Sequence, residues 1–479
     1  MEFGHPPPDG LNERSGYPFE RFILLFTFLV VIMVGLAVAE IVVPREDEAP
    51  AISESVLRGD ISAKTALAYS RYFPTMRAQI REAAETALKG YQEAADSDPS
   101  NPDIYRRMII LSQEIEPRDD RRFHAAIEGL RPVWPEAELW LDVYRLERPT
   151  SAAAKDYEKR IRALDLGWYE RVAMSRLYAR AGMPERAEAE RAAAESEALR
   201  TLVLLISLAL VLFVTGLVGI GLLIWYSRRK RGCDRSADLP ASSADPVVRA
   251  DAAGYLLEAF VVYVLLLTAV QLIGSAALDA ARISAEATVE VMFTATAYLF
   301  SGMLALIYLS ARLHSVGWNW VAVGLRSKEP LKDALWGVGA YAAALPLVLV
   351  TAFAAKWLSR YLPTSENAIV PLFVESESLA ARVAIFLLVV AAAPFFEELF
   401  FRGVLFSSLR ARWGVGAGVI VSAVAFGLVH PLPLGLLPIL VLGIVFAVAF
   451  NQRGSLLTCI VAHACNNAVA FALLSILAG

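Results

Sequence analysis

Nine long apolar runs restrict this chain to a helical membrane fold. Runs of about 18 or more apolar residues can cross a bilayer as helices. A backbone in lipid must satisfy its own hydrogen bonds, and no run alternates as a barrel strand does. The sequence, which is 56% hydrophobic, therefore predicts an all-α polytopic membrane bundle. The runs cover roughly residues 22–43, 201–226, 254–276, 291–311, 334–355, 380–408, 415–430, 436–451 and 455–477.

Basic residues give the predicted orientation. The sequence Arg228-Arg229-Lys230-Arg231 directly follows the second run, and the positive-inside rule places that end in the cytoplasm. Further basic residues fall on the same side if every later run crosses, namely Arg326, Lys328, Lys332, Arg410, Arg412 and Arg453. Residues 44–200 and the C-terminus then lie outside the cytoplasm. The first run resembles a signal peptide at Ala37-Val38-Ala39, but its length favours an uncleaved anchor.

Composition divides the chain into six predicted segments. Two of them flank the first apolar run: a disordered N-terminus and an extracytoplasmic helical domain rich in Ala, Glu and Arg. A cytoplasmic linker separates the second run from a membrane domain of seven spans. The segments are 1–21 (disordered), 22–43 (membrane anchor), 44–200 (helical domain), 201–226 (membrane span), 227–250 (linker) and 251–479 (membrane domain).

The helical domain carries weak repeat signals. Residues 87–94, followed by Pro99, look like the second helix of a tetratricopeptide repeat, because small residues flank Tyr91 and proline ends the helix. Tyr178, Gly182 and Ala187 fit the turn of another such unit. We therefore predict a tetratricopeptide-like array of helical hairpins, which would bind a protein partner on its concave face. An Ala-rich helical spacer is the alternative.

Six polar side chains lie within the last apolar runs: Glu397, Glu398, Arg402, His430, His463 and Asn467. Such groups are costly in a membrane, so they usually face the protein interior and mark a site. Glu398 and Arg402 are four residues apart on one helix face, which predicts an ion pair. Glu397 points about 100° away from Glu398. It is therefore free to face a cavity and to act as a general base.

The other polar residues lie on two further runs. His430 is followed by Pro431 and Pro433, which should end its helix inside the membrane. His463 and Asn467 are four residues apart and share one face. Together the groups can activate a water and hold an oxyanion. They can equally supply three ligands of a zinc ion, so the residue types leave the metal open.

Three motifs in order carry a family resemblance. Glu-Glu-x-x-x-Arg (397–402), Phe-x-x-x-His (426–430) and His-x-x-x-Asn (463–467) resemble those of the CPBP intramembrane proteases. That family includes the CAAX prenyl endopeptidase of the Ras-converting type and the bacterial Abi proteins. The resemblance implies an endopeptidase that cuts a membrane-associated peptide or protein. It also implies either a metal-dependent or a glutamate–water mechanism, and we favour the latter.

The resemblance assigns a role to each matching residue. Glu397 and His430 would activate the hydrolytic water, His463 and Asn467 would stabilise the oxyanion, and Glu398 with Arg402 would orient the site. A CAAX substrate requires a prenylated cytosolic protein, which most bacteria lack. The predicted topology favours a bacterial inner membrane and another membrane-associated peptide. No nucleic-acid partner is predicted.

Two other functions remain open from the sequence. A transporter or proton relay would need a continuous polar path and inverted repeats, and no repeat is visible among the runs. A non-catalytic scaffold would use the membrane domain only as an anchor, which requires none of the six polar residues. Convergence of Glu397, His430 and His463 on one water would favour the protease.

Overall fold

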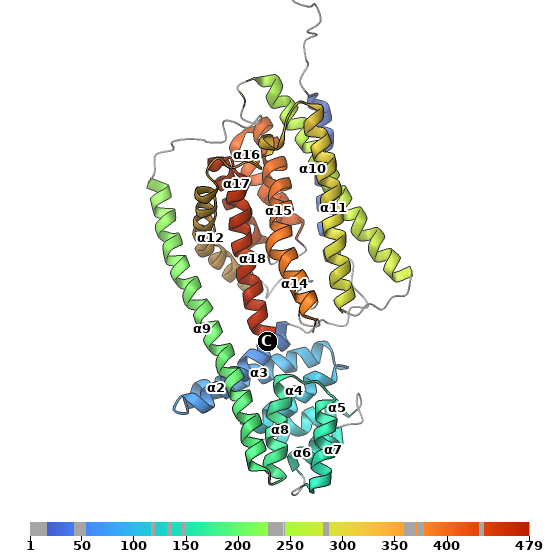
Figure 1. The fold of residues 1–479 in the computed structure, drawn as a ribbon, viewed down its shortest axis with the longest axis vertical. Helices are drawn as coiled ribbons and strands as arrows, with labels where there is room; N and C mark the ends of the chain where they lie inside the picture. The colour runs from blue at the N-terminus through green and yellow to red at the C-terminus, as the bar shows by residue number, and fades with distance from the viewer. Residues whose placement is uncertain are drawn as a thin grey trace, which may run out of the picture. The chain divides into compact units, whose positions relative to one another are not determined.

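The computed structural model describes residues 17–42, 54–115, 120–131, 137–145, 149–228, 243, 245–280, 287–358, 370, 373, 378–430 and 435–478. Regular structure in these residues is helical, without a strand, which confirms the all-α prediction (Figure 1). Contacts divide the chain into two compact units. We call Met1–Pro44 with Leu212–Ala472 the membrane unit, and Arg45–Val211 with Leu473–Gly479 the hairpin unit.

The hairpin unit is built from short helices that pack on their neighbours in sequence. Contacts join α2 to α3, α3 to α4, α4 to α5, α5 to α6 and α7 to α8. The tetratricopeptide-like assignment stays a prediction. The helices are α2 (Glu54–Tyr72), α3 (Arg77–Ser97), α4 (Pro102–Ile115), α5 (Asp120–Leu130), α6 (Ala137–Arg145), α7 (Ser151–Arg162), α8 (Trp168–Arg180) and the first part of α9 (Pro184–Arg228).

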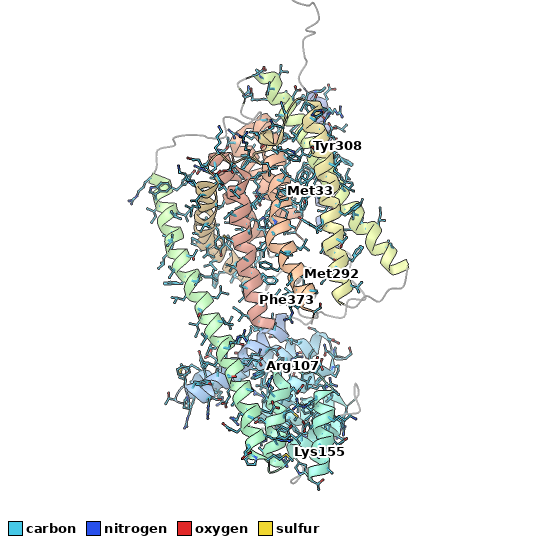
Figure 2. The ribbon with its side chains drawn as sticks, in the orientation of Figure 1. Met33, Arg107, Lys155, Met292, Tyr308 and Phe373 are labelled. Atoms are coloured by element: carbon cyan, nitrogen blue, oxygen red, sulfur yellow. The ribbon has the colours of Figure 1, made fainter. Side chains whose placement is uncertain are left out.

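Tyr91 is central to the packing of the hairpin unit. A Cβ at Gly59 would lie 2.4 Å from the Tyr91 ring, so α2 and α3 approach closely only because residue 59 is glycine. The Tyr91 hydroxyl donates to Asp60 Oδ1 at 2.6 Å and contacts the Tyr169 hydroxyl. Arg107 Nε lies 3.3 Å from the same Asp60 oxygen (Figure 2). This buried polar network therefore ties α2, α3, α4 and α8 together.

Glu114 on α4 is a mostly buried carboxyl group in the same unit. It lines a cavity of about 130 Å³ with residues of α2, α3, α8 and α9. Burial raises the pKa of Glu114 above its ordinary value of 4.5, and the nearby Arg176 and Arg191 oppose that shift. A raised pKa means that the folded state holds the proton more tightly than the unfolded state does.

The hairpin unit should therefore lose stability as pH rises from about 4.5 through the folded pKa of Glu114. The substitution Glu114→Gln keeps the neutral form at every pH, so we expect a flatter pH dependence and greater stability at neutral pH. Hydrogen exchange of α4 and α8, corrected for the intrinsic rate at each pH, measures the effect. Glu128→Gln, at an exposed position, is the matched control. An unchanged pH dependence in Glu114→Gln would contradict the prediction.

The membrane unit contains the long apolar helices. Its elements are α1 (Phe19–Val42), the remainder of α9, α10 (Pro246–Ala280), α11 (Ala287–Ser315), η3 (Trp320–Val323), α12 (Pro330–Leu358), α14 (Leu379–Leu387), η4 (Leu388–Ala392), α15 (Ala393–Glu398), η5 (Leu399–Phe406), α16 (Ser407–Leu428), α17 (Leu436–Arg453) and α18 (Leu456–Ala478) up to Ala472. Seven helices are long and apolar enough to cross a membrane within the described ranges, so this is a multi-pass membrane protein.

The number of helices that could span a membrane, seven, differs from the number of predicted runs, nine, for two reasons. One candidate, Leu379–Leu428, takes in both predicted runs 380–408 and 415–430 and is interrupted at Gly414, whose φ is 85° and ψ 174°. The first predicted run forms α1, a helix that is not one of the seven. Each predicted run therefore corresponds to a helix or to one arm of an interrupted helix.

At Gly414 the chain turns back on itself as a helical hairpin. A Cβ at Gly418 would lie 3.2 Å from the Arg410 backbone nitrogen, so residues equally far from Gly414 face each other. Further from Gly414, the Phe401 ring on the first arm faces the Phe426 ring on the returning arm, with centroids 5.1 Å apart. The returning arm, residues 415–428, is only about 21 Å long at 1.5 Å per residue. It is too short to cross a hydrocarbon core of about 30 Å, so its end lies at membrane depth.

The Gly414 backbone angles are accessible essentially to glycine alone. We expect Gly414→Ala to lower the thermal midpoint of the full chain in lipid nanodiscs, at a cost of about 1–3 kcal/mol. Gly416→Ala is the matched control, because an added Cβ there meets nothing within 4 Å. Equal midpoints for the two variants would contradict the hairpin.

Polar contacts fasten the remaining helices of the membrane unit. Glu258 on α10 accepts from Tyr308 at 2.9 Å and from Arg312 at 3.1 Å, both on α11. At the end of α17, Arg453 Nε donates to Asp333 Oδ1 on α12 at 2.7 Å. These pairs fix the helices that surround the predicted site.

Candidate active site

Two π-helical segments flank the helix that carries both site glutamates. η4 ends at Ala392 and η5 begins at Leu399, and the six residues of α15 between them include Glu397 and Glu398. Such π segments are rare and occur often at functional sites. Glu398 is fully buried, whereas the Glu397 side chain is 16% exposed, so the two neighbours have different surroundings, as predicted.

Pro394 leaves one carbonyl of η4 without a donor from its own helix. The Ala393 N–H donates to Leu388 O, and Pro394, five residues after Val389, has no N–H. Asn467 Nδ2 donates to Val389 O at 2.8 Å and fills this position from α18. Asn467 Oδ1 accepts from Asn466 at 3.2 Å. Asn467 thus has a structural partner that its spacing from His463 did not indicate.

This contact predicts coupling between residues 394 and 467. Asn467→Ala should lower the thermal midpoint, since a carbonyl shielded from water and left without a donor costs about 1–3 kcal/mol. In a Pro394→Ala background residue 394 regains an N–H, so the same change should cost less. Thermal unfolding of the four proteins in nanodiscs measures the coupling. Strictly additive midpoints would contradict the interpretation.

The Glu398 carboxylate contacts two side chains on different helices, the Arg402 guanidinium and the His463 imidazole. Arg402 Nη1 donates to Glu398 Oε1 at 2.9 Å, which confirms the predicted ion pair. His463 Nδ1 lies 2.8 Å from the same oxygen. Because an ionised carboxylate only accepts, His463 carries its proton on Nδ1. Arg402 is 1% exposed and His463 is 5% exposed, so this is a buried array.

Aromatic rings enclose the Arg402 guanidinium. Its carbon lies 4.3 Å from the centroid of Phe426 and 5.3 Å from that of Phe446. Arg402 Nη2 also donates to Gly443 O at 3.4 Å. Cation–π contacts and a fixed fork geometry hold the arginine in one place. Phe426 of the second motif therefore contacts the arginine of the first.

Glu397 Oε2 faces both imidazoles. It lies 4.0 Å from His430 Nε2 and 3.9 Å from His463 Nε2. The three side chains come from α15, from the residues after α16 and from α18, so the structure brings together groups of three helices. Two polar atoms this far apart are too distant for a direct hydrogen bond and close enough for one water to bridge.

His430 is oriented by the end of its own helix. Its Nδ1 lies 2.7 Å from Phe426 O, a carbonyl in the last turn of α16. A carbonyl only accepts, so Nδ1 carries the proton and Nε2 of the neutral ring has a lone pair. His463 has the same arrangement. Both Nε2 atoms and Glu397 Oε2 are therefore acceptors, and one water, which has two protons, can donate to two of them at a time. Pro431 and Pro433 lie outside the described residues.

The spacing of these atoms does not fit zinc. Two ligands of a tetrahedral zinc ion, each about 2.0–2.2 Å from the metal, lie about 3.3–3.5 Å apart. The separations from Glu397 Oε2 are wider, at 4.0 and 3.9 Å. Within the described part of the chain, no group of three His, Cys, Asp or Glu side chains is placed to hold a metal ion. A water that bridges Glu397 Oε2 and one of the imidazoles fits these separations better.

Two tyrosines that the sequence interpretation missed lie beside the site. Tyr298 on α11 donates to Glu397 Oε1 at 3.4 Å. Tyr263 on α10 is 2% exposed, and its hydroxyl interacts with that of Tyr298. Both are single hydroxyls in long apolar runs, and neither has a charged neighbour at helical spacing. The sequence therefore offered only a weak signal for them.

The fold and this geometry describe a class, namely a polytopic helical membrane protein with a carboxylate and two imidazoles of the kind that hydrolases use. Residues 379–469 match the family model described as Rce1-like, type II CAAX prenyl endopeptidase. This match confirms the resemblance to the CPBP and CAAX proteases over that segment, and it indicates a membrane protease. The segment contains all six predicted site residues. No curated protein and no solved structure matches the chain.

Proposed function

We propose that this chain is an intramembrane endopeptidase that cuts a membrane-associated peptide or protein with a water activated by Glu397 and His430. The observation that supports it is the separation of Glu397 Oε2 from the two imidazole nitrogens, at 4.0 and 3.9 Å. A transporter needs a path across the membrane, whereas these groups face one point. A scaffold needs no such group of acceptors.

In the proposed reaction, Glu397 takes a proton from the water while the water oxygen attacks the carbonyl carbon of the peptide bond. His430 Nε2 accepts from the same water and holds it in line. The C–N bond of the resulting tetrahedral intermediate breaks when the proton passes from Glu397 to the leaving nitrogen. The products are a carboxyl group and an amine, which balances the addition of one water.

Glu398, Arg402 and His463 have a supporting role in this proposal. His463 Nδ1 remains on Glu398, so His463 donates to an oxyanion only from a protonated Nε2. Asn467 reaches an oxyanion only with its second N–H, because the first is directed at Val389 O. We propose that Asn467 acts chiefly by holding η4, which precedes the glutamates.

We also propose a bacterial inner membrane as the location. The basic residues after the second run then face the cytoplasm, and residues 44–200 lie on the other side, where they bind a protein partner. A membrane-associated peptide other than a prenylated protein is the substrate class that this location favours.

The proposal predicts that Glu397→Gln abolishes cleavage while the protein still inserts. Loss of a general base lowers the rate by about 100- to 10,000-fold. Proteomic comparison of membranes from cells that produce the wild type or Glu397→Gln should show a peptide that accumulates uncut. Glu258→Gln is the matched control, because Glu258 is a carboxylate of the membrane unit held by Tyr308 and Arg312. Identical peptide patterns for wild type and Glu397→Gln would reject the protease and favour the scaffold.

A further inference from the structure

Glu397 presents its two oxygens to different surroundings. Oε2 faces His430 and His463, whereas Oε1 accepts a hydrogen bond from Tyr298 at 3.4 Å. We infer that Tyr298, with Tyr263 beside it, is a positioning residue that holds Glu397 Oε2 toward the imidazoles at a distance that leaves room for the hydrolytic water. This inference rests on the proposed function.

The site needs such a restraint because Oε2 is buried and has no hydrogen-bond partner among the described residues. Both Nε2 atoms lie within 4.0 Å of Glu397 Oε2, but their rings carry the proton on Nδ1, so neither imidazole donates to the carboxylate. A rotation of the Glu397 side chain would therefore move Oε2 away from a water held beside the imidazoles. A donor on the opposite oxygen resists this rotation, and Tyr298 provides it. A carboxylate held in its reactive geometry needs no reorganisation during the reaction.

Close packing of α11 against α15 fixes the position of Tyr298. Its ring meets Phe396 edge to face, with centroids 6.0 Å apart. One turn further along α11, a Cβ at Gly302 would lie 2.7 Å from the Phe396 ring, so only glycine permits this approach. Tyr298 and Gly302 lie on the same face of the helix. The hydroxyl therefore reaches Glu397 from a rigid helix and not from a loop.

Tyr263 adjoins Tyr298 from a fixed position on α10. It lies flat on Phe400, with ring centroids 4.0 Å apart and planes 2° apart. Its hydroxyl is a neighbour of the Tyr298 hydroxyl. Because Tyr298 gives its one proton to Glu397, it can only accept from Tyr263. Tyr263 therefore supports Glu397 only through Tyr298.

The inference is tested with phenylalanine variants of the full chain in nanodiscs. The probe is a pool of internally quenched peptides, each a single apolar span, from which those cut by wild type and left intact by Glu397→Gln are selected. We expect Tyr298→Phe to lower kcat by about 10- to 100-fold, the value of a hydrogen bond to a charged group. KM should stay within about twofold, because the inferred role of Tyr298 is to position Glu397 and not to bind the substrate.

Tyr308→Phe is the matched control, because Tyr308 lies on the same helix and donates to a different carboxylate, Glu258 (Figure 2). We expect kcat within about twofold of wild type. Tyr263→Phe should lower kcat less than Tyr298→Phe does. The double variant should be no slower than Tyr298→Phe alone, because Tyr263 acts only through Tyr298. Thermal midpoints of all variants show whether a loss reflects folding.

The outcomes distinguish a failure of the inference about Tyr298 from a failure of the protease proposal. A wild-type kcat in Tyr298→Phe, a change in KM alone, or multiplied losses in the double variant would each overturn the inference and leave the protease proposal standing. If wild type cuts no peptide that Glu397→Gln spares, the protease proposal itself fails and the inference fails with it.

Discussion

The shared Glu398 carboxylate is the interaction on which the rest of the site depends. It receives Arg402 from its own helix and His463 from α18, in a region with almost no exposure. Removing one partner of such a buried pair leaves an unpaired charge, which typically costs about 3–5 kcal/mol. The array therefore fixes the distance between α15 and α18. It also directs His463 Nε2 at Glu397, so the charge that stabilises the helices also arranges the atoms of the candidate site.

Backbone irregularities place the remaining groups. A regular helix through residues 379–428 would carry His430 far from Glu397. The turn at Gly414 reverses the chain and returns His430 to the level of the glutamates. The π segments and Pro394 break the regular ladder of hydrogen bonds, and Asn467 compensates from another helix. The π segments thus adjoin the glutamates, and the turn at Gly414 acts from the far end of the hairpin.

The sequence predicted those features that are local or depend on composition. Apolar runs indicated the helical membrane class, and four-residue spacing indicated the pair of Glu398 and Arg402. The bond between Glu398 and His463 joins residues 65 positions apart, so no helical spacing could reveal it. The resemblance implied that Asn467 stabilises the oxyanion, yet its contact with Val389 depends on a π turn that no periodicity shows. Tyr298 was missed because a lone tyrosine in an apolar run resembles ordinary packing.

The short arm after Gly414 also bears on how a hydrolase obtains water inside lipid. An arm of about 21 Å beside a hydrocarbon layer of about 30 Å creates a mismatch, which a bilayer meets by local thinning or by bending its neighbours. Thinning brings the headgroups, and the hydration that accompanies them, nearer to the arm's end. His430 lies at that end. The short arm that brings His430 to the candidate site therefore also shortens the path that water must take from the aqueous phase to that site.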